Sequence, residues 1–150
     1  MKIGKYYIYV ILTVITFLIA PSFLTAYTNS FTIDGTAVFN KAGDVYVKLL
    51  DKEQFEKDVK GLDPQTPFVY IIKAENGVKK APFKFAGVPG GTYAIACFQD
   101  VDGNGKLDIG MFGPTEPWGY YGKRPSFIPV FKEESFILSN DLTNITIEIK

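Results

Sequence analysis

"FAGVPGGTYAIACFQDVDGNGKLD", residues 85–108, places a Pro-Gly-Gly turn between two apolar runs and ends in an acidic, glycine-rich segment. The two glycines allow the backbone angles that a tight turn requires. After the turn, Tyr93, Ile95 and Cys97 occupy alternate positions, so they share one side of a strand. This segment therefore predicts a strand, a tight turn and a second strand that leads directly into the acidic loop.

The chain on either side of this segment also has the pattern of short strands. Apolar and polar residues alternate most clearly in "NITIEIK" (144–150), whose three isoleucines share one face, and Asn76-Gly77 is a strong hairpin signal. The other strong strand candidates are residues 31–39, 44–51, 67–74 and 78–88, and the weaker ones are 126–131 and 134–139. Only residues 52–62 have helical character. About seven strands joined by Gly, Pro and Asn turns predict an all-β antiparallel sandwich.

The N-terminus differs in composition from the rest of the 150-residue chain. Residues 1–26 contain Lys2 and Lys5, then an uncharged apolar helix-length stretch and a small-residue end, which is the order of a secretory signal peptide. Residues 6–26 are also about 20 residues long, enough to span a bilayer as an uncleaved anchor. In both cases the lysines stay inside, so residues 27–150 are expected in the periplasm, on the cell surface or outside the cell. Contact with a membrane is expected only through residues 6–26.

Several classes of function are excluded by composition. The chain contains no histidine, which removes Ser-His-Asp and Cys-His catalysis, histidine zinc sites and an imidazole pH switch. A single cysteine, Cys97, cannot form an internal disulfide, and its mid-strand position predicts a small buried hydrophobe. The formal net charge is zero and no basic run exceeds two residues, so binding to nucleic acid through a positive face is not expected.

The acidic segment has the spacing of a calcium loop. Oxygen-bearing side chains recur at every second residue and a glycine, Gly105, stands where the tight turn of such a loop falls. The predicted ligands are the side chains of Asp100, Asp102, Asn104 and Asp108 and the main-chain carbonyl of Lys106. The alternative is a solvated acidic turn, because Asp, Asn and Gly favour turns without any metal.

The resemblance to an EF-hand loop is incomplete. Met111 stands where an EF-hand has its bidentate glutamate, and the flanking sequence predicts a strand before the loop and no helix after it. Glu116 is the nearest downstream carboxylate and can complete the ligand shell. A site without the bidentate ligand is expected to bind calcium weakly, with a Kd on the order of 10⁻⁴–10⁻³ M, which suits a structural role outside the cell.

An aromatic segment, "FGPTEPWGYYG" (112–122), follows the acidic loop. Exposed side chains of Trp118, Tyr120 and Tyr121 would form a platform for stacking on sugars or for contacting a protein. Alternatively, these side chains fold back and close one end of the sandwich, since large aromatics mostly bury their area. Glu116 with a loop aspartate would be the acid and base of a hydrolase, although no nucleophile–base set is visible in the sequence.

The chain resembles domain-of-unknown-function family 2141, a group of exported bacterial domains. The resemblance rests on residues 85–108, which match the signature GVPxGTYA…DxDxNGKLD, on the aromatic segment 112–122, and on "ESFILS" and "ITIEI" near the C-terminus. It extends over residues 43–150. This chain has Gln99 where many relatives have histidine. The resemblance implies a fold, export and a loop site but no reaction, and the GVPxGxY turn is also similar to transthyretin-like sandwich modules.

Together, these observations predict an exported, non-catalytic β-sandwich module of the bacterial envelope, of transthyretin-like or immunoglobulin-like type, with a structural calcium loop. Its partner would be a protein or a glycan that the sequence does not identify. The alternatives are a carbohydrate-binding module that uses the loop aromatics and, least supported, a hydrolase.

Overall fold

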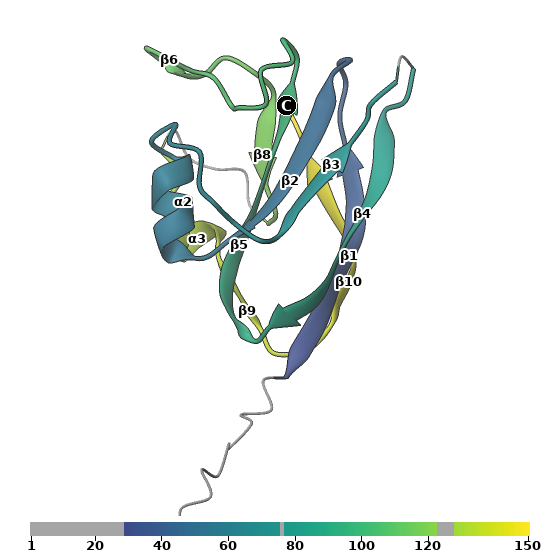
Figure 1. The fold of residues 1–150 in the computed structure, drawn as a ribbon, viewed down its shortest axis with the longest axis vertical. Coiled ribbons are helices and arrows are strands. Elements are labelled where there is room, and N and C mark those ends of the chain that lie inside the picture. Colours follow the sequence, from purple (N-terminus) through teal and green to yellow (C-terminus); the bar gives the residue numbers. More distant parts are fainter. Residues whose placement is uncertain (1–28, 76, 123–127) are drawn as a thin grey trace, which may run out of the picture.

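The computed structural model describes residues 29–75, 77–122 and 128–150 (Figure 1). Within these ranges the chain forms ten strands and two short helices, so the predicted all-β class is confirmed. The predicted signal peptide or anchor and Asn76 of the predicted hairpin lie outside the described residues. Over the described ranges, neither helix has the length and apolar character needed to cross a membrane.

A three-stranded sheet forms one face of the molecule. Its central strand is β1 (Ser30–Val38), which lies between β4 (Lys80–Pro89) and β10 (Leu142–Glu148). Strand β1 pairs with β4 in antiparallel fashion but with β10 in parallel fashion, so the prediction of antiparallel pairing throughout is wrong here. The first and last strands run in the same direction, and no hairpin joins them. A Cβ on Gly35 would lie 2.5 Å from the Ile145 carbonyl oxygen, so this close approach requires glycine.

A five-stranded sheet forms the opposite face. Its main path is β3 (Val69–Ile72), β2 (Asp44–Leu50), β5 (Gly91–Asp100) and β8 (Trp118–Tyr120), all antiparallel. The fifth strand, β9 (Phe136–Leu138), pairs with the beginning of β5. The Pro-Gly-Gly turn therefore carries the chain from β4 in one sheet to β5 in the other.

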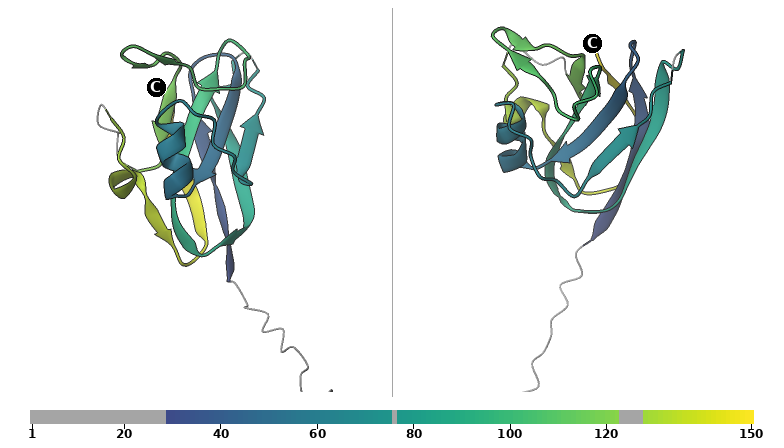
Figure 2. Two further views of the ribbon diagram at one scale, coloured as in Figure 1. Left: turned by 60° about the vertical axis from the view of Figure 1, so that its left-hand side comes forward. Right: turned by 45° about the horizontal axis from the view of Figure 1, so that its top comes forward.

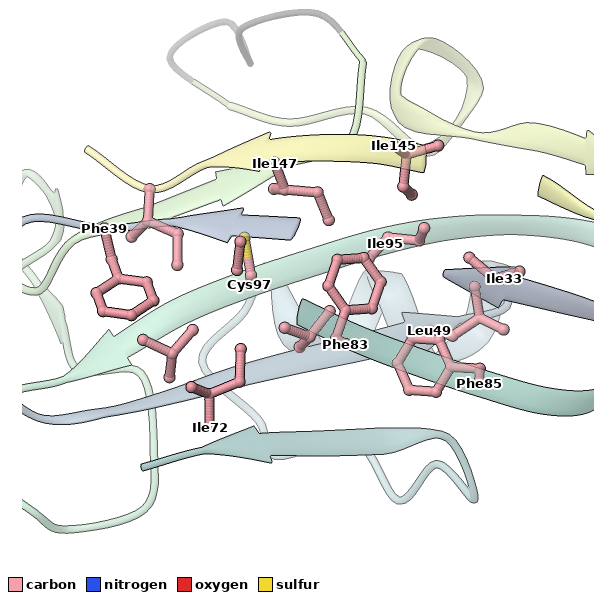
Figure 3. Close-up of a cluster of buried hydrophobic side chains, with 14 of the residues drawn as sticks. Ile33, Phe39, Leu49, Ile72, Phe83, Phe85, Ile95, Cys97, Ile145 and Ile147 are labelled. Carbon is pink, nitrogen blue, oxygen red and sulfur yellow. The ribbon is translucent and has the colours of Figure 1, made fainter. Parts of the chain in front are cut away.

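The two sheets pack face to face in a sandwich-like arrangement around one apolar core (Figure 3). Alternate residues of the long strands point into it, as the sequence predicts, except that the register of β4 shifts between Phe85 and Val88. The core residues from these strands include Ile33, Ala37, Val45, Val47, Leu49, Phe83, Phe85, Ile95, Cys97, Ile145 and Ile147. Burial of Cys97 confirms its predicted role as a small hydrophobe.

Two helices cover the outer face of the five-stranded sheet (Figure 2). Helix α2 (Lys52–Asp58) begins at a capping box, because the Asp51 carboxylate accepts a hydrogen bond from the Gln54 amide and the Gln54 side chain accepts one from the Asp51 amide. Its buried Phe55 and helix α3 (Phe131–Glu134) pack with β8 in a second, smaller apolar cluster.

Two parts of the strand prediction are wrong. Residues 126–131 are a predicted weak strand, but the described residues 128–130 are not in a strand and α3 begins at Phe131. None of the predicted strands lies within residues 101–122, but this segment contains three short strands, namely β6 (Ile109–Gly110), β7 (Gly113–Pro114) and β8. Strands of two or three residues are too short to give a periodic signal, because the partner strand supplies most of their stability.

Candidate metal centre in the acidic loop

The acidic loop, residues 100–108, begins where β5 ends. Asp100 is the last residue of β5 and lies opposite Asp44, the first residue of β2. Gly43 has a φ of +124°, and a Cβ there would lie 2.1 Å from the Asp100 carbonyl oxygen. The preceding turn can approach the start of the loop this closely only because residue 43 is glycine. The loop therefore lies at the end of the sandwich that also carries the β1–β2 turn (Figure 1).

Asp100 organises the loop from inside. Its side chain is buried, and Oδ1 accepts hydrogen bonds from the amides of Gly103 (2.8 Å) and Asn104 (3.1 Å), while Oδ2 accepts one from Gly105 (2.9 Å). Both glycines have φ near +80°, a conformation that glycine adopts without strain. A carboxylate offers about four acceptor positions, so three amides leave roughly one for a cation.

Asn104 connects the two other loop aspartates. Its amide nitrogen donates to Asp102 Oδ1 at 3.0 Å, and its side-chain Nδ2 donates to Asp102 Oδ2 at 3.1 Å and to Asp108 Oδ2 at 3.0 Å. Asn104 Oδ1 accepts a hydrogen bond from the Lys106 amide at 2.8 Å. A single amide group thus holds two carboxylates together, and the predicted ligand residues form one connected network.

Glu116 closes the loop from the far side of the β6–β7 hairpin. Its side chain is buried, and Oε1 accepts a hydrogen bond from the Val101 amide at 2.6 Å, while Oε2 accepts a longer one from the Asp108 amide at 3.5 Å. The Asp108 carbonyl in turn accepts a hydrogen bond from the Thr115 amide at 2.9 Å. One carboxylate therefore holds the beginning and the end of the acidic loop in place.

Carboxylate oxygens of Asp100, Asp102 and Glu116 all lie within 4.8 Å of one another. Calcium binds oxygens at 2.3–2.6 Å, so two oxygens on one ion are at most about 5.2 Å apart. The separations lie within the span of the ligands of one cation site. Asp102 is exposed and gives access to solvent, whereas Asp100 and Glu116 are buried beneath it. Three negative charges this close repel one another unless a cation or protons neutralise them.

Only two of the predicted ligand side chains, Asp100 and Asp102, belong to the group of three converging carboxylates. Asp108 stands outside the group of three carboxylates but is joined to it through Asn104 and Glu116. Lys106 is exposed. Glu116, which the sequence offers only as the nearest downstream carboxylate, lies in the centre of the arrangement.

The aromatic residues of the following segment do not share one surface. Trp118 and Tyr120 point to the outer face of β8, where Tyr120 is buried against Phe55 and the Trp118 and Tyr120 rings make an edge-on contact at 5.7 Å. Tyr121 packs against the main core and makes an edge-on contact with Phe136. The three side chains of the predicted platform are therefore divided between the two faces of the sheet.

Gln99 has a structural role that the sequence does not indicate. It is fully buried, its Nε2 donates to the Lys41 carbonyl, and its Oε1 accepts from the Lys41 amide at 3.2 Å. These bonds tie the β1–β2 turn to β5 just before the acidic loop. The only sequence signal is the departure from histidine at this position, which points to a difference from relatives but not to a contact.

Comparison with known proteins identifies the family and no individual relative. A family model described as an uncharacterized protein conserved in bacteria, domain of unknown function 2141, matches residues 33–146. No curated protein and no solved structure matches the chain. The matched region includes every strand from β2 to β9 and the whole acidic loop. The chain belongs to the domain-of-unknown-function family 2141.

Proposed function

We propose that residues 27–150 form an exported, non-catalytic module of the bacterial envelope whose acidic loop is ordered by calcium. The apolar N-terminal segment supports export, as a signal peptide or as an anchor. The two packed sheets support an architecture of transthyretin-like or immunoglobulin-like type, in which loops at the end of the sandwich carry the contacts to a partner, a protein or a glycan.

One observation carries the calcium proposal. It is the convergence of the Asp100, Asp102 and Glu116 carboxylates to within 4.8 Å, from positions before, within and after the loop. Glu116 joins the cluster from beyond the β6–β7 hairpin, so the three carboxylates converge from residues that are not adjacent in the sequence. Three backbone amides donate hydrogen bonds to the Asp100 carboxylate, so the fold fixes the position of these two oxygens before any ion binds.

Calcium would supply positive charge among three carboxylates that otherwise repel each other. The residues of the chain determine what that charge stabilises. Glu116 links the loop to the hairpin that follows it, and Asp108 is held through Asn104, so neutralising the cluster should order both segments together. The expected product is a rigid surface at one end of the sandwich.

The proposal is tested by thermal unfolding of the purified protein in EDTA and in 10 mM calcium. With a Kd on the order of 10⁻⁴–10⁻³ M, this concentration should stabilise the fold by about 1.4 to 2.7 kcal/mol. The Asp102→Ala variant should lose the response. Magnesium at the same concentration should give a smaller shift, because it requires shorter, near-octahedral coordination. Identical melting curves with and without calcium would show that the loop is an acidic turn.

A further inference from the structure

A pocket that contains none of the proposed calcium ligands lies between helix α2, the β6–β7 hairpin and strand β8. This cavity, termed the hairpin pocket, has a volume of about 260 Å³. Its described lining is mostly apolar, and the residues that bear on its chemistry are Asp58, Phe112, Trp118 and Tyr120. Small-molecule sites usually occupy about 300–1,000 Å³, so the hairpin pocket suits a small ligand.

Three aromatic side chains line the hairpin pocket from two sides. Trp118 and Tyr120 come from β8, with their ring centroids 5.7 Å apart and their planes at 82°. Phe112 comes from the turn of the β6–β7 hairpin and is 86% exposed, so its ring is not needed to fill the core. Aromatic faces carry partial negative charge and attract cations, with tryptophan the most effective.

A buried aspartate, Asp58, also lines the hairpin pocket. Asp58 is only 8% exposed, and the described residues that line the hairpin pocket include no lysine or arginine. Among the described residues, the cation paired with Asp58 is Lys48, whose Nζ is 3.6 Å from Asp58 Oδ1 but 3.0 Å from Asp63 Oδ1. Burial raises the pKa of the Asp58 carboxyl more than Lys48 lowers it. Lys48 is thus shared between two carboxylates, and a second cation on the pocket side would stabilise the charged form of Asp58.

From this arrangement we propose that the hairpin pocket binds a small organic ammonium ion. The aromatic rings would contact its alkyl groups, and Asp58 would pair with its positive charge. A neutral apolar molecule of the same shape would gain only the apolar contacts and leave Asp58 as it is. None of the proposed calcium ligands lines this site, and so it extends the proposed function to a second ligand of a different chemical class.

The chain provides its own reporter for the test. Trp118 is the only tryptophan in the sequence and it lines the pocket, so intrinsic tryptophan fluorescence reports on this site alone. Purified protein is titrated with choline and, separately, with its neutral isostere 3,3-dimethylbutan-1-ol, with sodium chloride as the ionic-strength control. Choline should give a saturable change in emission, with an affinity about ten-fold or more above that of the isostere. Absence of saturation by choline, or equal affinity for the two molecules, would overturn the proposal.

Three variants locate the interaction. Asp58→Asn should weaken choline binding about ten-fold or more, whereas Glu56→Gln, which removes an exposed acidic charge of the same helix that does not line the pocket, should leave it within about two-fold. Phe112→Ala removes an exposed ring without affecting the core and should weaken binding several-fold, so it tests the site even if Asp58→Asn does not fold. Unchanged binding in Phe112→Ala and in a folded Asp58→Asn would refute the assignment.

Discussion

Replacing Asp102 by asparagine should have opposite effects on stability in the absence and in the presence of calcium. In EDTA, the charge of Asp102 lies within 4.8 Å of the charges on Asp100 and Glu116. At that distance two like charges repel by about 0.9 kcal/mol even at the dielectric constant of water. Removing both repulsions should therefore stabilise the variant by about 1.7 kcal/mol. The variant also loses the exposed hydrogen bond that Asn104 Nδ2 donates to Asp102 Oδ2, which costs roughly 0.5–1 kcal/mol. The net gain is about 1 kcal/mol, or a rise in Tm of about 4 °C for a domain of this size.

In 10 mM calcium the order should reverse. The wild type gains about 1.4 to 2.7 kcal/mol from binding, whereas the variant has lost its accessible charged ligand and gains little. Differential scanning calorimetry in the two buffers measures both shifts. Glu56→Gln, which removes an exposed acidic charge of α2 outside the acidic loop, is the matched control, and its Tm relative to wild type should be the same in both buffers. A difference between Asp102→Asn and wild type that has the same sign and size in EDTA and in calcium would refute the charge-cluster argument.

Two further predictions concern the fold that supports the loop. Phe55→Ala should destabilise the protein by about 3–5 kcal/mol in urea unfolding, because Phe55 is buried between Tyr120 and Phe131; a loss below 1 kcal/mol would contradict this packing. Burial raises the pKa of Cys97, so its thiol stays protonated at pH 8 and should react with Ellman's reagent only after unfolding in urea; rapid reaction of the folded protein would contradict its position in the core.

Strand alternation and turn chemistry are local signals, and they predict most of the core. Val45, Val47 and Leu49 of β2 and Phe83 and Phe85 of β4 all point inward as the two-residue period requires. The same local reasoning locates the end of β5 and the acidic loop, since glycine, asparagine and aspartate favour turns over continued strand.

Features that depend on contacts distant in sequence could not be predicted in this way. Strand β8 contains three residues and is held by β5 on one side and by Lys150 on the other, through the bonds of Trp118 with Lys150 at 3.2 Å. Glu116 enters the loop network from beyond the hairpin, and Gln99 reaches Lys41, which is 58 residues away. The parallel pairing of β1 with β10 likewise joins the first and last strands of the fold, and no local sequence pattern predicts it.

The most direct test of the calcium proposal is a crystal structure of the protein grown or soaked in calcium. The proposal predicts one ion in the acidic loop, bound by oxygens of Asp100, Asp102 and Glu116 at about 2.3–2.6 Å. Further oxygens from Asn104, the Lys106 carbonyl, Asp108 or water would complete six to eight ligands. A loop without an ion at saturating calcium, with these carboxylates bonded only to backbone amides, would contradict it.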